Sequence, residues 1–203
     1  MTQTLTQIFD QAGGDKGSFF CHVGTTQNLA HRYTYTYEQY MEPYRDQKFS
    51  LLEIGVCCPF FPGASLRAWY QYFQRADIFG LDIVDCSRFD NDRVKTFIVD
   101  QTSESQLQSF LRIATRFKFM IDDGCHDERA ITISLGALFP ALEGGGVYFI
   151  EDLHVVKKDN LLRLVDKSFT SPFISQDKLD YINQNIASAV FSDDQKMCII
   201  TKL

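Results

Sequence analysis

Long apolar runs are missing from this sequence, and their absence excludes a membrane-spanning protein. No stretch approaches the roughly 18 consecutive apolar residues that a transmembrane helix needs. Residues 1–4 also lack the charged and apolar regions that begin a signal peptide. There is neither an internal repeat nor a low-complexity linker. We therefore expect a cytoplasmic globular protein with no membrane partner.

Cysteines with metal-binding spacing are missing too. The sequence holds six cysteines, and no two of them form a Cys-x-x-Cys pair. In a reducing compartment such residues are buried or free thiols, so a structural zinc site is not expected. The cysteines stand at Cys21, Cys57, Cys58, Cys86, Cys125 and Cys198.

An excess of positive charge is also absent. The 20 Lys and Arg are outnumbered by 26 Asp and Glu, which gives a formal net charge of −6. A chain of this charge has no field that attracts phosphate backbones, so nucleic acid is not an expected partner. The sequence does have length and apolar content. Its 203 residues, 45% of them hydrophobic, are enough for one domain with a full core, spanning 1–203.

Apolar runs alternate with helix-length amphipathic segments along the chain. This pattern is typical of an α/β protein whose mostly parallel sheet carries helices on both faces. The short polar connection 192–196 predicts an antiparallel hairpin at the C-terminal end. Strands are expected at 51–56, 78–82, 96–100, 117–122, 147–151, 187–191 and 197–201, and helices at 65–73, 104–115, 129–139 and 160–169. The first 45 or so residues precede this pattern, and we expect them to cover the ligand end of the sheet.

Two of the expected strands end abruptly in acidic residues. Asp123 follows the strand 117–122, and Glu151 with Asp152 closes the strand at 147–151. Ligands of open α/β sheets bind beyond the carboxyl ends of the strands, and neighbouring strands lie about 5 Å apart. The three acids would then share one hard cation, Mg²⁺, Mn²⁺ or Ca²⁺ rather than zinc. The alternative for Asp123 is a helix cap.

A second signal lies at the end of the first strand. Gly55 follows the strand and would let the backbone approach a ligand closely, ahead of a helix that begins near Ser65. Asp82 ends the second strand, where nucleotide-binding sheets place an acid on the ribose hydroxyls. Asp100 and Gln101 end the third and could reach an adenine edge. Each of these signals alone occurs in many unrelated sheets.

Taken together, the motifs resemble the S-adenosylmethionine- and Mg²⁺-dependent O-methyltransferases typified by the macrocin and mycinamicin sugar enzymes. The resemblance implies a seven-stranded Rossmann-like class I methyltransferase sheet, with Asp123, Glu151 and Asp152 on Mg²⁺ or Mn²⁺ and His126 as general base. The matching stretches are 13–17, 31–34, 51–56, 63–69, 79–83, 100–101, 121–126 and 144–154. The cofactor residues that it implies are Lys16, Tyr33, Glu53, Gly55, Ser65, Asp82, Asp100, Gln101 and Asp122.

This chemistry agrees with the residue types. A neutral hydroxyl is a poor nucleophile for in-line methyl transfer; a divalent cation lowers its pKa and a nearby histidine takes its proton. His126 lies three residues after Asp123, so in a helical turn both side chains face the same way. The alternative for His126 is a surface residue beside acidic neighbours.

We therefore expect a metal-dependent O-methyltransferase that acts on a hydroxyl of a small molecule, a sugar or secondary metabolite. Two alternatives stay open. One is an N-methyltransferase or hydroxylase-like enzyme on the same fold. The other is a non-catalytic protein that serves as an interaction module. It either binds S-adenosylmethionine or has lost that binding through the loop 57–62, which is longer than the loop at this place in the family it resembles. The sequence does not decide the acceptor, or between a monomer and a homo-oligomer.

Overall fold

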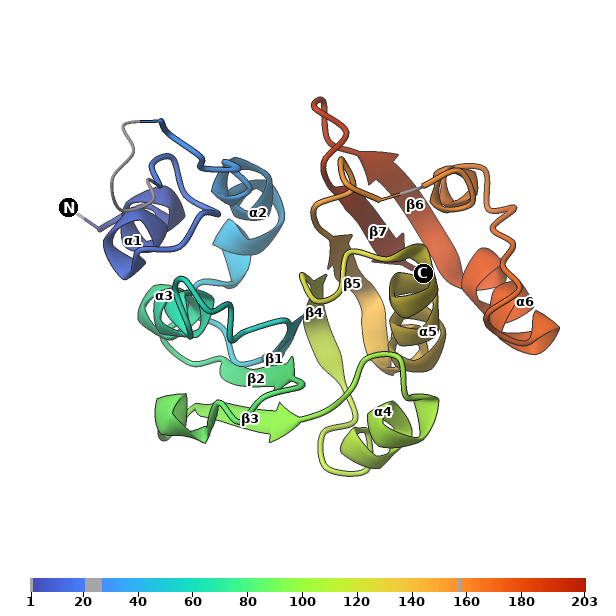
Figure 1. Ribbon diagram of the computed structural model, residues 1–203, viewed down its shortest axis with the longest axis horizontal. Coiled ribbons are helices and arrows are strands. Elements are labelled where there is room, and N and C mark those ends of the chain that lie inside the picture. The colour runs from blue at the N-terminus through green and yellow to red at the C-terminus, as the bar shows by residue number, and fades with distance from the viewer. Residues whose placement is uncertain (1, 21–26, 157) are drawn as a thin grey trace.

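A single mixed sheet forms the centre of the protein in the computed structural model, which describes residues 2–20, 27–156 and 158–203 (Figure 1). Cys21 lies outside the described residues. In the described ranges the sheet has seven strands in the order β3-β2-β1-β4-β5-β7-β6. The strands are β1 (Ser50–Ile54), β2 (Asp77–Asp82), β3 (Val94–Ile98), β4 (Phe117–Asp122), β5 (Leu142–Ile150), β6 (Ile186–Phe191) and β7 (Cys198–Lys202).

Strands β1 to β5 pair in parallel, whereas β7 runs antiparallel to both of its neighbours. The sequence-based prediction of a mostly parallel sheet with an antiparallel C-terminal hairpin is therefore confirmed. The helices are α1 (Leu5–Ala12), α2 (Thr34–Met41), α3 (Ala64–Tyr72), α4 (Glu104–Phe110), α5 (Glu128–Leu138) and α6 (Gln176–Asn185), with 3-10 turns at Glu42–Tyr44, Ser87–Phe89, Phe139–Ala141 and Leu161–Leu164. In the described ranges no helix is long and apolar enough to cross a bilayer.

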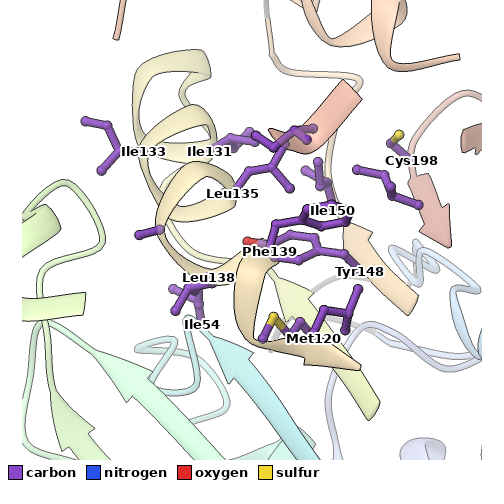
Figure 2. Packing of buried hydrophobic residues seen from close by; sticks show 14 of the residues in the cluster. Ile54, Met120, Ile131, Ile133, Leu135, Leu138, Phe139, Tyr148, Ile150 and Cys198 are labelled. Atoms are coloured by element: carbon purple, nitrogen blue, oxygen red, sulfur yellow. The ribbon is translucent and has the colours of Figure 1, made fainter. Parts of the chain in front are cut away.

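The helices cover both faces of the sheet. Helices α1, α2 and α3 pack on one face around Trp69, and α4, α5 and α6 on the other around Tyr148. Figure 2 shows the second core, where α5 residues such as Leu135 and Leu138 approach Met120 and Tyr148. Because side chains alternate across a strand, a strand covered on both faces is apolar throughout. This explains the uninterrupted apolar run at the end of β5.

One predicted helix is wrong. Residues 160–169 form only the 3-10 turn Leu161–Leu164. The chain turns at Lys167, which has a positive φ of 55°, and Phe169 is held through its backbone N–H and C=O by the side chain of Asn183 in α6. These contacts with α6 replace the backbone bonds that would continue a helix.

The register of the central strands sets the position of the ligand end. Ile54 pairs with Asp122, and Asp122 pairs with Ile150, so β1, β4 and β5 end side by side. Backbone bonds continue one residue further, from Asp123 N–H to the carbonyl of Ile54 at 3.1 Å and from Glu151 N–H to that of Asp122 at 3.0 Å. The first residues after three adjacent strands are thus held together.

Candidate functional site

Asp123, His126 and Asp152 converge at the ends of β4 and β5. Each offers one ligand atom, and these atoms lie within 4.8 Å of one another. The Nε2 atom of His126 is 3.3 Å from Oδ2 of Asp152. All three residues line a cavity of about 390 Å³ that opens beyond the carboxyl edge of the sheet. Two carboxylates and an imidazole at this spacing form a donor set suited to a divalent cation.

Asp152 reaches this cluster because the chain leaves the strand immediately before it. Strand β5 ends at Ile150, and Asp152 has a positive φ of 54°. In an extended strand, Glu151 and Asp152 would point to opposite faces. The left-handed turn directs Asp152 toward the cavity, while Glu151 is buried beneath it with 1% of its surface exposed.

Glu151 contacts groups from the N-terminal segment. Its Oε2 atom lies 2.6 Å from Nζ of Lys16, and its Oε1 accepts a hydrogen bond from the hydroxyl of Tyr37. Lys16 also donates to Asp123. The structure thus brings Asp123 and Asp152 together with His126. It places the carboxylate of Glu151 in the buried part of the site, next to Lys16.

Asp152 is held by further residues of the N-terminal segment. Its Oδ1 atom is 3.0 Å from Nδ1 of His31, and the hydroxyl of Tyr33 donates a hydrogen bond to it. Burial opposes ionisation of Asp152, but the hydrogen bonds from His31 and Tyr33 outweigh it and hold its pKa below the usual range. The same bond to Asp152 raises the pKa of His31. Asp152 is therefore an ionised carboxylate at the cavity.

The two neighbouring acids behave in the opposite way. Burial raises the pKa of Asp123 to about 7; Lys16 opposes this shift, and the charges of Asp152 and Glu53 add to it. Burial and the nearby charge of Asp123 raise the pKa of Glu151 well above its usual range. Crowded carboxylates of this kind favour a nearby positive charge, because opposite charge stabilises the ionised form.

The wall of the cavity comes mainly from the loops after β1, β2, β3 and β4. Gly55, with a φ of 87°, closes the end of β1. A Cβ atom at this position would lie 2.0 Å from the carbonyl oxygen of Asp123, so only glycine lets the two loops meet. Asp82 accepts hydrogen bonds from the backbone N–H of Cys57 at 2.8 Å and of Val84 at 3.2 Å, and this ties the loop after β1 to the end of β2.

Of the remaining predicted cofactor residues, Asp100 and Gln101 line the cavity and Asp122 lies behind it. The amide of Gln101 donates to Asp122 at 3.0 Å and accepts from the backbone N–H of Cys125 at 2.5 Å. Asp122 also accepts from Ser134 and Tyr148. Its role in the structure is to hold Gln101, which in turn holds the loop after β4.

Glu53 and Ser65 lie at the deep end of the site. Glu53 is fully buried, and its Oε2 accepts from the indole N–H of Trp69 at 2.8 Å. Its Oε1 has no hydrogen-bond partner and is 3.6 Å from Nζ of Lys16. Ser65 and Lys16 line an adjoining cavity of about 20 Å³, room for about one water. A buried acceptor without a partner suits a ligand that brings a donor.

Tyr37 and His31 are not among the catalytic, cofactor or metal residues expected from the sequence. Tyr33 and Tyr37 are four residues apart, so on a helix their side chains share one face. That spacing, in a segment rich in tyrosine, is the signal that could have identified Tyr37 as a partner of Glu151. His31 belongs to the matching stretch 31–34, but its contact with Asp152 depends on how the N-terminal segment packs beside the end of β5.

Comparison with known proteins finds relatives of this chain. No protein-family model matches the chain. The chain is 39% identical over 126 residues to 8-demethyl-8-alpha-L-rhamnosyl tetracenomycin-C 2'-O-methyltransferase of Streptomyces olivaceus, covering 61% of this chain and 33% of that protein. It is 40% identical over 126 residues to mycinamicin VI 2''-O-methyltransferase of Micromonospora griseorubida, covering 61% and 32%. The chain thus spans about a third of the length of these curated relatives.

Solved structures agree with the sequence relatives. The mycinamicin-pathway methyltransferase MycE, in complex with Mg, S-adenosylhomocysteine and mycinamicin VI, superposes with a TM-score of 0.79 at 27% identity, over 99% of this chain and 55% of MycE. The Podospora anserina methyltransferase PaMTH1 superposes with a TM-score of 0.54 at 13% identity and shares the fold. The matching sequences, the strand order and the superposition with MycE show that the chain has the class I methyltransferase fold and is similar to the macrocin and mycinamicin sugar O-methyltransferases.

Proposed function

We propose that this chain transfers a methyl group from S-adenosylmethionine to a sugar hydroxyl of a glycosylated polyketide or similar secondary metabolite, with the help of a divalent cation. The observation that carries the proposal is the convergence of Asp123, His126 and Asp152 on the wall of the 390 Å³ cavity. The names of the relatives, which describe methylation of rhamnosyl and mycinamicin hydroxyls, support the acceptor class.

The cavity along β1, β2 and β3 is the proposed cofactor site. Its volume lies within the range of small-molecule pockets, about 300 to 1,000 Å³. Asp82 would accept hydrogen bonds from ribose hydroxyls, and Asp100 with Gln101 would border the base. Gly55 allows the close backbone approach, while Glu53, Lys16 and Ser65 would border the amino-acid end. Tyr33 and Asp122 would act indirectly, through Asp152 and Gln101.

Asp123 and Asp152 are the proposed core of the cation site, with Glu151 as a third carboxylate. The first two already present ligand atoms to one point, and Glu151 adjoins Asp123 through their shared contact with Lys16. When bound, a divalent cation would supply the positive charge that favours ionisation of an acceptor hydroxyl. Asp123 and Asp152 would orient the acceptor by holding that charge at the cavity wall.

His126 is the proposed general base. Its side chain is one-third exposed, lines the cavity, and lies within hydrogen-bond distance of Asp152 through Nε2. If Nε2 carries the ring proton and donates a hydrogen bond to Asp152, Nδ1 is free to accept the proton of the acceptor hydroxyl. Asp152 would orient the ring and stabilise the imidazolium that forms. His126 could instead be a cation ligand, since its Nε2 belongs to the same donor cluster.

Substitution of His126 distinguishes these roles. We expect His126→Gln to lower methyl transfer to a rhamnosylated acceptor by about 10² to 10⁴, which is the contribution of a general base. S-adenosylhomocysteine and Mn²⁺ affinities, measured by calorimetry, should stay within a factor of about three of wild type, because a base acts on the acceptor. The matched control is His154→Gln, whose ring lies further from Asp152, at 3.9 Å.

Three outcomes would contradict parts of this proposal. A loss of Mn²⁺ affinity in His126→Gln would make His126 a ligand. Full activity in excess chelator would remove the cation from the reaction and favour another enzyme on the same fold. Wild-type protein that binds no S-adenosylhomocysteine would favour the non-catalytic interaction module.

A further inference from the structure

Lys16 places a buried ammonium among three carboxylates. Its Nζ atom is 2.6 Å from Oε2 of Glu151 and 3.6 Å from Oε1 of Glu53, and it also contacts Oδ2 of Asp123. Only 4% of the Lys16 surface is exposed. Glu53 is the second-last residue of β1, and Asp123 and Glu151 directly follow β4 and β5, so one ammonium joins the ends of three adjacent strands.

The backbone around Lys16 is fixed by the segment that follows it. The carbonyl of Lys16 accepts a hydrogen bond from the N–H of Thr34 at 3.1 Å, and the carbonyl of Asp15 accepts from His31 at 2.7 Å. The acids that Lys16 contacts after β4 and β5 lie 107 and 135 residues away along the chain. The ammonium therefore comes from the N-terminal segment, whereas the acids come from the ends of the sheet strands.

Charge balance gives this ammonium a specific consequence. Three carboxylates this close together repel one another, and burial makes each unpaired charge costly. A lysine ammonium is a compact point charge with three donors, enough for all three acids. It offsets their repulsion when no other cation is present. The same positive charge repels a divalent cation that approaches Asp123.

We propose that Lys16 is a positioning residue: a resident cation that holds Asp123 and Glu151 in place in the cation-free protein and lowers the affinity of the site for divalent cations. This inference rests on the proposed cation site. In this inference Lys16 acts on the carboxylates of Asp123 and Glu151, whether or not it also contacts the cofactor. The site would exchange divalent cations readily, because the Lys16 ammonium keeps the three carboxylates in place after one cation leaves and before the next one binds.

The test compares Lys16→Met with wild type by measuring Mn²⁺ affinity with electron paramagnetic resonance, without acceptor or cofactor. Methionine keeps an unbranched apolar stem and removes the charge. We expect Lys16→Met to bind Mn²⁺ at least about tenfold more tightly, because a like charge within a few ångströms is gone. In chelator, its urea midpoint should fall below that of wild type, and saturating Mn²⁺ should restore it. The control is Lys48→Met, which removes an exposed ion pair with Asp77 and should change neither quantity appreciably.

The inference would be overturned if the wild-type protein binds Mn²⁺ and Lys16→Met binds it equally or more weakly. Lys16 would then be a packing residue. If neither protein bound Mn²⁺, the proposed cation site itself would fail, and the inference with it. Should Lys16→Met not fold, the comparison moves to Glu151→Gln with and without Lys16→Met, where one buried acid is already neutral. The double variant should again bind Mn²⁺ more tightly than Glu151→Gln alone, and equal affinities would overturn the inference.

Discussion

Single residues just after β1 and β5 adopt backbone conformations that bring the parts of the site together. Gly55 and Asp152 both have positive φ, 87° and 54°. For Gly55 the reason is steric, because the neighbouring loop leaves no room for a side chain. For Asp152 the conformation costs energy, of order 1–3 kcal/mol for a non-glycine residue. Its bonds to His31 and Tyr33 offset that cost, so the strain and the contacts that stabilise it belong to the same site.

The first prediction at this scale concerns Gly55. We expect Gly55→Ala to lower the free energy of unfolding by about 3 kcal/mol or more, because the new Cβ adds a clash 2.0 Å from the carbonyl of Asp123 to an unfavourable φ. Urea unfolding measures this. Gly13→Ala is the matched control, because Gly13 has a similar φ of 84° with no atom within 4 Å of the added Cβ. It should lose only about 1–2 kcal/mol; equal losses would show that the loops separate without cost.

Which residues meet at the site was partly predictable. The convergence of Asp123 with Asp152 follows from strand ends that carry acids, a rule of parallel sheets. The inward turn of Glu151 was not predictable, because alternation along a strand does not say which of two adjacent acids faces the cavity. The contacts of Lys16 with Asp123 and Glu151 depend on packing between segments more than 100 residues apart, and local sequence patterns carry no signal of that range.

At the scale of elements, helix α3 links the core to the deep end of the site. Its Trp69 packs edge to face on Phe9 of α1 at 4.8 Å between ring centroids, and donates to Glu53 in β1. Three residues on, the hydroxyl of Tyr72 is buried without a hydrogen-bond partner. The same helix face thus carries one satisfied polar group and one unsatisfied one.

This contrast gives the second prediction. Trp69→Phe should lower the free energy of unfolding by about 2–4 kcal/mol, because it removes part of a fully buried ring and leaves Glu53 without its indole donor. Tyr72→Phe should be neutral or slightly stabilising, since it removes a buried hydroxyl that makes no bond. Urea unfolding of both variants in chelator checks this. A large loss in Tyr72→Phe would mean that an ordered water or ligand bonds that hydroxyl.

Elements with strong apolar periodicity were predicted, and those without it were missed. Helices α3 and α5 are shifted by one residue from their predicted bounds, and α4 ends at Phe110, five residues earlier than predicted. Helix α6 buries only Leu179 and Ile182, and α2 is dominated by tyrosine and threonine, so neither has a clear apolar stripe. The short α1 depends on its capping box at Thr4 and on packing against α3.

At the scale of the whole molecule, the two proposed ligand sites share the carboxyl edge of one sheet. The loops after β1, β2 and β3 form much of the cavity wall, and the loops after β4 and β5 complete it with Asp123 and Asp152. Gly55 and Asp123 connect the two parts through a direct contact between their loops. The N-terminal segment reaches both, through Asp15 at the cavity and Lys16 at the acids. A chain that spans about a third of its curated relatives therefore contains residues for both proposed sites.

The last prediction follows from this arrangement: the chain by itself should be stabilised separately by S-adenosylhomocysteine and by Mn²⁺. A ligand at 100 times its dissociation constant raises the free energy of unfolding by about 2.7 kcal/mol when it binds only the folded state. Thermal unfolding with each ligand, and with Mn²⁺ followed by excess chelator, measures the two effects. Asp82→Asn should lose most of the S-adenosylhomocysteine effect and keep that of Mn²⁺, because Asp82 borders the proposed ribose position and no cation ligand. Asp123→Asn should show the reverse.

Two outcomes would contradict this prediction. If Asp82→Asn lost the stabilisation by both ligands, the end of β2 would support the fold of the whole carboxyl edge of the sheet. If neither ligand stabilised the wild-type chain, both proposed sites would be contradicted.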